Sequence, residues 1–171
     1  DNPRKTCPFV SASGCEIYQD RPAACRIYPV ARASRMHRLH GTVQEDYFVL
    51  HEAHCRGFEE SRSWSVQVWT QDQGLEKYHH FNNQWMEIIT HPRLLQDNGI
   101  SEKQQQMFFL ASYNMEKFRD FVLGGRFLDL FDLPERMAKA VVDSDEALLE
   151  LAFLWLKFSL CNEPVLKIRG R

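Results

Sequence analysis

The sequence lacks a hydrophobic run long enough to cross a membrane. No stretch of its 171 residues approaches the roughly 20 consecutive apolar residues that a transmembrane helix needs. It also lacks an excess of one charge, since 21 basic and 23 acidic residues give a net charge of −2. No global field therefore attracts nucleic acid or anionic lipid, and no known nucleic-acid-binding module is recognisable. These absences argue against membrane and nucleic-acid partners.

The chain begins DNPRKT, without a secretory leader pattern and without an initiator methionine, so we expect a cut or processed front. Disulfide frameworks are typical of much smaller secreted domains, and we therefore predict a reducing, cytoplasmic compartment. In that compartment clustered thiols more often mean metal binding or catalysis than crosslinks. Disulfides remain the alternative, because a lost leader peptide would leave no trace here.

Common catalytic signatures are missing as well. The sequence has no Walker loop, no nucleophile elbow, no H-E-x-x-H motif and no tight C-x-x-C pair of the kind that zinc fingers use. No reaction class can be named from motifs.

Two halves of different composition are present. Residues 1–63 are rich in Cys, Arg, His and Pro and lack a helical period, with short strands expected at 14–19 and 46–53. Residues 64–171 carry apolar side chains at helical spacing. We predict a mainly α protein: an irregular cysteine-rich region with short strands, followed by a bundle of about five to six helices packed on it as a single compact domain.

Helix boundaries in the second half are marked by capping residues. Residues 64–91 predict two consecutive helices interrupted at Gly74 and ended by His91-Pro92. The last helix is apolar nearly all round and is expected to be central, with Cys161 as a core residue. We expect further helices to begin at Ser101, Asn114, Pro134 and Ser144. Each of these residues is of a type that caps or begins helices.

Four of the five cysteines lie in the first third of the chain, namely Cys7, Cys15, Cys25 and Cys55. Their spacing alone is a weak signal, but turn residues beside them could let several sulfur atoms converge. Arg21 and Arg26 could offset thiolate charge, and His54 is expected as a neighbouring group rather than a ligand. The alternative interpretation is that these cysteines are small buried hydrophobic residues beside a solvated arginine face.

A specific combination of motifs carries a resemblance: CPF at 7–9, CEIYQDRPAACRIYP at 15–29 and CRG at 55–57. The combination resembles the YkgJ-type cysteine-cluster family, bacterial proteins described as zinc- or iron-chelating domains. The resemblance implies a centre, either an iron–sulfur cluster or Zn, held by the four early cysteines. Such proteins usually carry a further C-x-x-C-x-x-C-C group ahead of C-P-F. Its absence implies either additional ligands in a missing front or a member that has lost them.

Three functional hypotheses follow. The first is a metal-binding protein whose helical half supports the site and offers a surface to a protein partner. The second is a metal-dependent redox or group-transfer enzyme, for example one that modifies proteins, which would need an open coordination position beside the metal. The third is a helical interaction module without metal.

Overall fold

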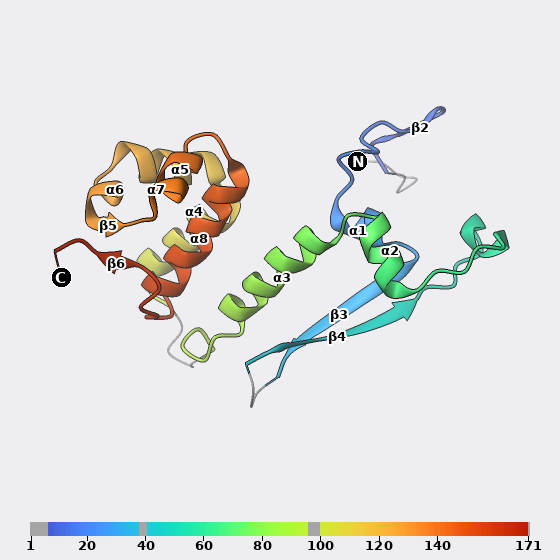
Figure 1. Cartoon of the computed structure of the whole chain (residues 1–171), viewed down its shortest axis with the longest axis horizontal. Helices are drawn as coiled ribbons and strands as arrows, with labels where there is room; N and C mark the ends of the chain where they lie inside the picture. Colours follow the sequence, from blue (N-terminus) through green and yellow to red (C-terminus); the bar gives the residue numbers. More distant parts are fainter. Residues whose placement is uncertain (1–6, 38–40, 96–99, 171) are drawn as a thin grey trace. The chain divides into compact units, whose positions relative to one another are not determined.

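The computed structural model describes residues 7–37, 41–95 and 100–170 (Figure 1). The chain packs as two compact units, residues 1–82 and residues 83–171, which we call the cysteine-rich unit and the helical unit. The division falls inside helix α3 (Glu76–Ile89). The mainly α class with short two-stranded sheets is confirmed. The compositional boundary at residue 63 and the single compact domain stay predictions.

Two antiparallel hairpins form the strands of the cysteine-rich unit. In the first, β1 (Val10–Ser11) pairs with β2 (Gly14–Cys15), and Gly14 adopts a φ of 112°, which favours glycine. In the second, β3 (Val30–Met36) pairs with β4 (Val43–Val49) in a long ribbon that Figure 1 shows clearly. The longer hairpin is the main scaffold of this unit.

The strands differ in extent from the sequence-based expectation. The strand expected at 14–19 ends at Cys15, because Asp20 N donates to Ile17 O and closes a turn. The strand expected at 46–53 lies at 43–49 instead, and residues 50–54 are not in a strand. Strand β3 was not expected, since its sequence VARASRM is poor in the β-branched and aromatic residues typical of strands.

The cysteine-rich unit has almost no core of its own. Its helices are α1 (Ala23–Ile27), the 3-10 helix η1 (Arg56–Glu59), α2 (Val66–Asp72) and the first turns of α3. Among the unit's described residues, Leu75 is the only fully buried apolar side chain. Large apolar side chains that remain exposed are Phe9, Val10, Tyr18, Phe48, Val49, Leu50, Phe58, Val66 and Val68.

The helical unit follows the predicted caps closely. Ser101 forms a full capping box with Gln104, and Asn114 and Ser144 each accept a backbone N–H in the first turn of their helix. Pro134 precedes its helix as expected. The elements of this unit besides the end of α3 are α4 (Glu102–Tyr113), α5 (Met115–Gly124), α6 (Phe127–Leu130), β5 (Phe131–Asp132), α7 (Glu135–Ala140), α8 (Asp145–Ser159) and β6 (Lys167–Ile168).

Helix α8 is central in the helical unit, as its apolar sequence predicts. Helices α4, α5 and α7 all contact it, and its buried side chains are Leu148, Leu151, Ala152, Phe153 and Leu156. Cys161 just beyond the helix is 3% exposed, so the prediction of a core residue is confirmed. Across the part of the chain that the structure describes, no helix combines the length and apolar character required to cross a membrane.

Candidate functional site

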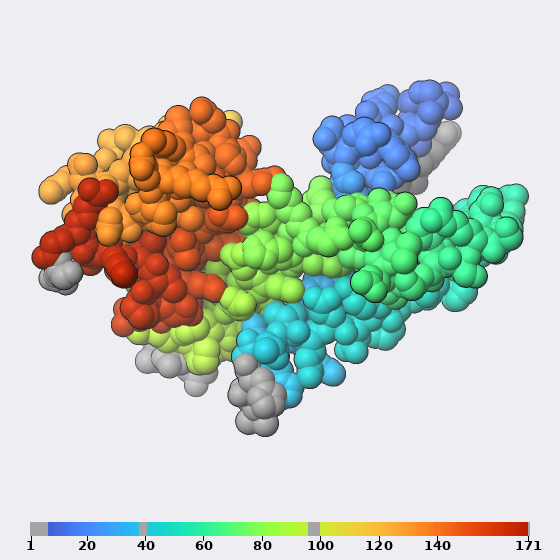
Figure 2. Space-filling model, in the orientation of Figure 1, coloured from blue at the N-terminus to red at the C-terminus, as the bar shows by residue number. Residues whose placement is uncertain are grey.

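Cys7 and Cys15 lie at the open end of the β1–β2 hairpin. Cys15 is the register partner of Val10, and Val10 N donates to Cys7 O over 3.3 Å. Glu16 N donates to Phe9 O over 2.9 Å, which extends the pairing toward Cys7. Cys7 is exposed and Cys15 half-buried, and Figure 2 shows this blue segment at the molecular surface. The hairpin therefore presents both thiols near one end.

Cys25 and Cys55 flank the base of the β3–β4 hairpin. Cys25 lies in α1, directly before β3, where its N–H donates to Pro22 O over 2.9 Å. Cys55 follows β4 and occupies the position directly before η1, and its N–H donates to Glu52 O over 2.9 Å. Leu50 N donates to Pro29 O and closes the hairpin at this end. The segments that enter and leave the hairpin thus each carry one thiol.

All four early cysteines are free thiols, but the structure does not gather them at one point. Within the described residues, the one set of three or more His, Cys, Asp or Glu ligand atoms lying within 4.8 Å of one another comprises His91, Cys161 and Glu163. The early thiols are outside it. Their donor chemistry suits a thiolate-bound metal, whereas their present arrangement is open.

Cys55 is bordered by proton-bearing side chains. The Tyr28 hydroxyl oxygen lies 3.3 Å from His54 Nε2, the two rings are stacked, and His54 Nε2 is 3.5 Å from Glu52 Oε2. Desolvation together with hydrogen bonds to Glu52 and Cys55 raises the pKa of the Tyr28 phenol. His54, predicted beside the cysteine, therefore lies in a polar cluster that reaches Cys55 through Tyr28.

Arg21 and Arg26 hold the loop between Cys15 and Cys25. Arg21 Nη2 donates to Gln73 Oε1 over 3.0 Å, and Arg26 Nη1 donates to Gln73 O over 3.3 Å, at the end of α2. Arg26 Nε also donates to Arg21 O over 2.8 Å. These bonds fasten the thiol-bearing loop to a helix, and the balancing of thiolate charge by the two guanidinium groups stays a prediction.

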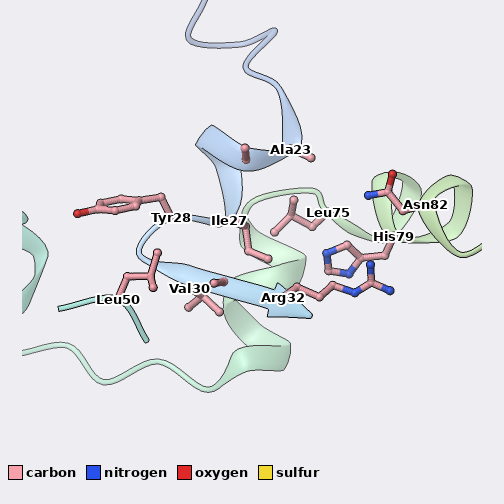
Figure 3. A pocket seen from close by; sticks show the side chains of 11 residues that line it. Ala23, Ile27, Tyr28, Val30, Arg32, Leu50, Leu75, His79 and Asn82 are labelled. Atoms are coloured by element: carbon pink, nitrogen blue, oxygen red, sulfur yellow. The ribbon is translucent and has the colours of Figure 1, made fainter. Parts of the chain in front are cut away.

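A pocket of about 350 Å³ lies between α1, β3 and α3 in the same unit (Figure 3). Figure 3 shows Arg32, His79 and Asn82 grouped on one side, with aliphatic side chains such as Ile27 and Leu75 on the other. The Arg32 side chain is 7% exposed and donates to Glu45 Oε1 over 2.7 Å. Desolvation and the nearby Arg32 charge lower the pKa of His79.

Sequence reasoning identified neither the pocket nor the group around Cys161. The pocket is assembled by α1, β3 and α3, which approach one another only in the folded unit. His91 lies 70 positions before Cys161. The sequence predicts only that a helix ends at His91 and that Cys161 is a core residue, and neither prediction brings the two together. The signal that could have pointed to Glu163 is its place two residues after a buried cysteine.

The chain matches no family model, and no curated protein or solved structure is significantly similar to it. The resemblance to the YkgJ-type family therefore stays a prediction.

Proposed function

We propose that the cysteine-rich unit binds a metal centre, an iron–sulfur cluster or zinc, through the thiolates of Cys7, Cys15, Cys25 and Cys55. One observation carries the proposal. Among its described residues the unit has these four free thiols but only one fully buried apolar side chain, Leu75. Sulfur ligands, rather than a hydrophobic core, are then the means available for stabilising it.

The deficit of buried apolar surface is the physical reason to expect a metal. A unit of this size buries only roughly 60% of its unfolded surface even when it packs well, and poorer cores need disulfides, a metal or a partner. Exposed Phe9, Phe48 and Phe58 show how little apolar surface this unit buries. A structural zinc site contributes about 10 to 16 kcal/mol of binding free energy, and this becomes folding free energy.

The open arrangement of the thiols is compatible with this role. Metal sites that are coupled to folding are rarely preformed, because the ion itself draws its ligands together. Two thiols at the end of one hairpin and two at the base of another supply four donors from short segments without a rigid core. Thiolate donors suit both zinc and iron–sulfur clusters, and the sequence resemblance supports the same ligand set in a bacterial, cytoplasmic protein.

Metal analysis of anaerobically prepared protein tests the proposal. We expect either zinc, or iron with acid-labile sulfide and visible absorption, and we expect the double variant Cys15→Ser/Cys25→Ser to lose this metal. Glu150→Gln on α8 serves as the control, because that exposed carboxylate lies in the helical unit. A colourless protein without metal, whose double variant folds like the wild type, would contradict the proposal and favour an interaction module.

A second candidate, a metal-dependent redox or group-transfer enzyme, is favoured by the pocket of Figure 3. That pocket is lined by residues of α1, the helix that carries Cys25, and by Tyr28, which also contacts Cys55. Catalysis requires an open coordination position. Addition of cyanide or azide to the cobalt-substituted Cys161→Ala variant, whose remaining thiols are the four early ones, should change its visible spectrum in this case and leave a closed four-sulfur site unchanged.

A further inference from the structure

The ends of α3 and α8 come together in the helical unit. The rings of Trp85 and Phe153 lie 5.9 Å apart, and Lys157 forms an ion pair with Glu87. Both contacts advance in the same direction along the two helices, so the helices run in the same general direction and their C-terminal ends meet.

His91 and Cys161 lie one turn beyond this ion pair, each four residues further along its own segment. The chain after α8 then turns back, with Asn162 in the left-handed region at a φ of 63° and Glu163 N donating to Lys157 O over 3.1 Å. This turn places Glu163 against the other two side chains. His91 Nε2 is 3.6 Å from Glu163 Oε1, and the three ligand atoms lie within 4.8 Å of one another.

The surroundings of His91, Cys161 and Glu163 favour the binding of a cation. Two helix C-termini meet here, and each carries a partial negative charge. Burial, and then the Glu163 carboxylate, raise the pKa of the Cys161 thiol. Arg93 and Lys157 oppose this effect, but the Lys157 ammonium is paired with Glu87. A bound divalent ion would convert the buried thiol to a thiolate.

We propose that His91 Nε2, Cys161 Sγ and a carboxylate oxygen of Glu163 bind a zinc-type divalent ion at the junction of α3 and α8. Mixed nitrogen, sulfur and oxygen donors are typical of zinc, and three protein ligands leave a fourth position for water. The His91 and Glu163 side chains are 22% and 36% exposed, so the ion can enter from solvent. The site lies wholly in the helical unit and does not depend on the function proposed for the cysteine-rich unit.

Two rearrangements accompany binding. Arg93 N donates to His91 Nδ1 over 3.2 Å, and a metal at Nε2 requires the ring proton on Nδ1, so this hydrogen bond must open. The Cys161 thiol releases its proton to solvent, and the imidazole moves its proton from Nε2 to Nδ1.

Cobalt titration of the full chain tests the site directly. With Cys7, Cys15, Cys25 and Cys55 all replaced by Ser, Cys161 is the only thiol left, so any thiolate-to-cobalt charge-transfer absorption reports this site. We expect that absorption to saturate at one Co²⁺ per chain and to disappear when Zn²⁺ is added.

Single substitutions in the same background assign the ligands. Cys161→Ala should abolish the absorption. His91→Gln or Glu163→Gln should weaken Co²⁺ binding at least about 100-fold, because even the loss of a residue that only hydrogen-bonds to a metal ligand costs up to about 100-fold in affinity. His80→Gln on α3 and Glu150→Gln on α8 are matched controls and should leave the titration unchanged. Absence of the absorption in the folded fourfold variant, or its persistence with unchanged affinity in His91→Gln and Glu163→Gln, overturns the proposal.

Zinc stoichiometry of the otherwise wild-type chain provides a second test if the fourfold variant does not fold. The zinc bound per chain should fall by one in Cys161→Ala and in His91→Gln/Glu163→Gln, but not in Glu150→Gln. Equal zinc in all of them overturns the proposal. The same measurement separates the two proposed sites. If the early cysteines bind no metal, the wild-type chain should hold one zinc, which Cys15→Ser/Cys25→Ser retains and Cys161→Ala loses.

Discussion

At the scale of single residues, His79 shows how burial and a neighbouring charge, that of Arg32, shift the pKa of an imidazole. Its ring lines the pocket of the cysteine-rich unit together with Arg32. The Arg32 charge lowers the pKa of His79, whereas the carboxylates of Glu45 and Glu76 raise it. The net result is a lowered pKa, with desolvation the largest cause and Arg32 next. Unfolded imidazole titrates near 6.5, so below roughly that pH the unfolded chain binds the proton more readily than the folded one.

We therefore expect His79 to destabilise the fold as the pH falls. Stability should be lost progressively from about pH 6.5 down to the lower pKa of the folded state, and His79→Gln should make urea unfolding less dependent on pH in that range. NMR titration of the imidazole should place the His79 midpoint below about 6.5. His80→Gln, one position further along α3, is the control. A pH dependence unchanged in His79→Gln but reduced in His80→Gln would contradict the assignment.

The cysteines show what sequence reasoning can and cannot reach at this scale. Cys161 was predicted as a core residue from its apolar helix, and its burial is confirmed because that environment is local in sequence. Its proximity to His91 and Glu163 depends on the register between two packed helices, which no local pattern encodes. The convergence of Cys7, Cys15, Cys25 and Cys55 stays a prediction for a related reason, since it would depend on an ion that draws them together.

At the scale of elements, the capping box of α4 offers a clean measurement. Gln104 N donates to Ser101 Oγ over 3.4 Å, and Ser101 N donates to Gln104 Oε1 over 2.9 Å. We expect Ser101→Ala to lower the free energy of unfolding of the helical unit by about 1 kcal/mol, and Ser101→Asp to restore most of it. Urea unfolding followed by far-UV circular dichroism measures both. An equal loss in the two variants would mean that the cap does not stabilise the helix.

Helices were predicted better than strands, and the physical reason is locality. Ser101, Asn114 and Ser144 each satisfy amides within their own next turn, so the residue type alone indicates where a helix begins. Strand β3 owes its conformation to pairing with β4 across the hairpin, and its own composition gave no indication of it. Helix α1 was also missed, since five residues after Pro22 are too few to show a period.

At the scale of the whole molecule, the two units differ in what can stabilise them. The helical unit buries a contiguous set of apolar side chains around α8, including Phe118, Leu148 and Leu151. The cysteine-rich unit buries only Leu75 among its described residues. Composition indicated this contrast. The packing division lies inside α3, and the boundary expected from composition at residue 63 stays a prediction. Residues 64–82 look helical in sequence, yet they pack with the cysteine-rich unit.

This contrast predicts that metal removal loosens one unit far more than the other. If thiolate ligation replaces a core, chelation should speed hydrogen exchange at the amides of the β3–β4 hairpin at least about tenfold, because those amides are then protected only by local bonds. Amides of α5 and of the first turns of α8 should keep their protection, since buried side chains such as Phe118 and Leu148 hold them. Hydrogen exchange with mass spectrometry resolves the two sets of peptides in a single sample.

The variants separate this effect from the second site. Cys15→Ser/Cys25→Ser without chelator should reproduce the loss of protection in the hairpin, whereas His91→Gln/Glu163→Gln should leave the hairpin unchanged and affect only peptides at the ends of α3 and α8. Exchange in the hairpin that is equal with and without metal would mean that the cysteine-rich unit is stabilised by something other than its thiolates. A binding partner would then be the remaining physical means, because an exposed apolar surface of this kind cannot stabilise a fold alone.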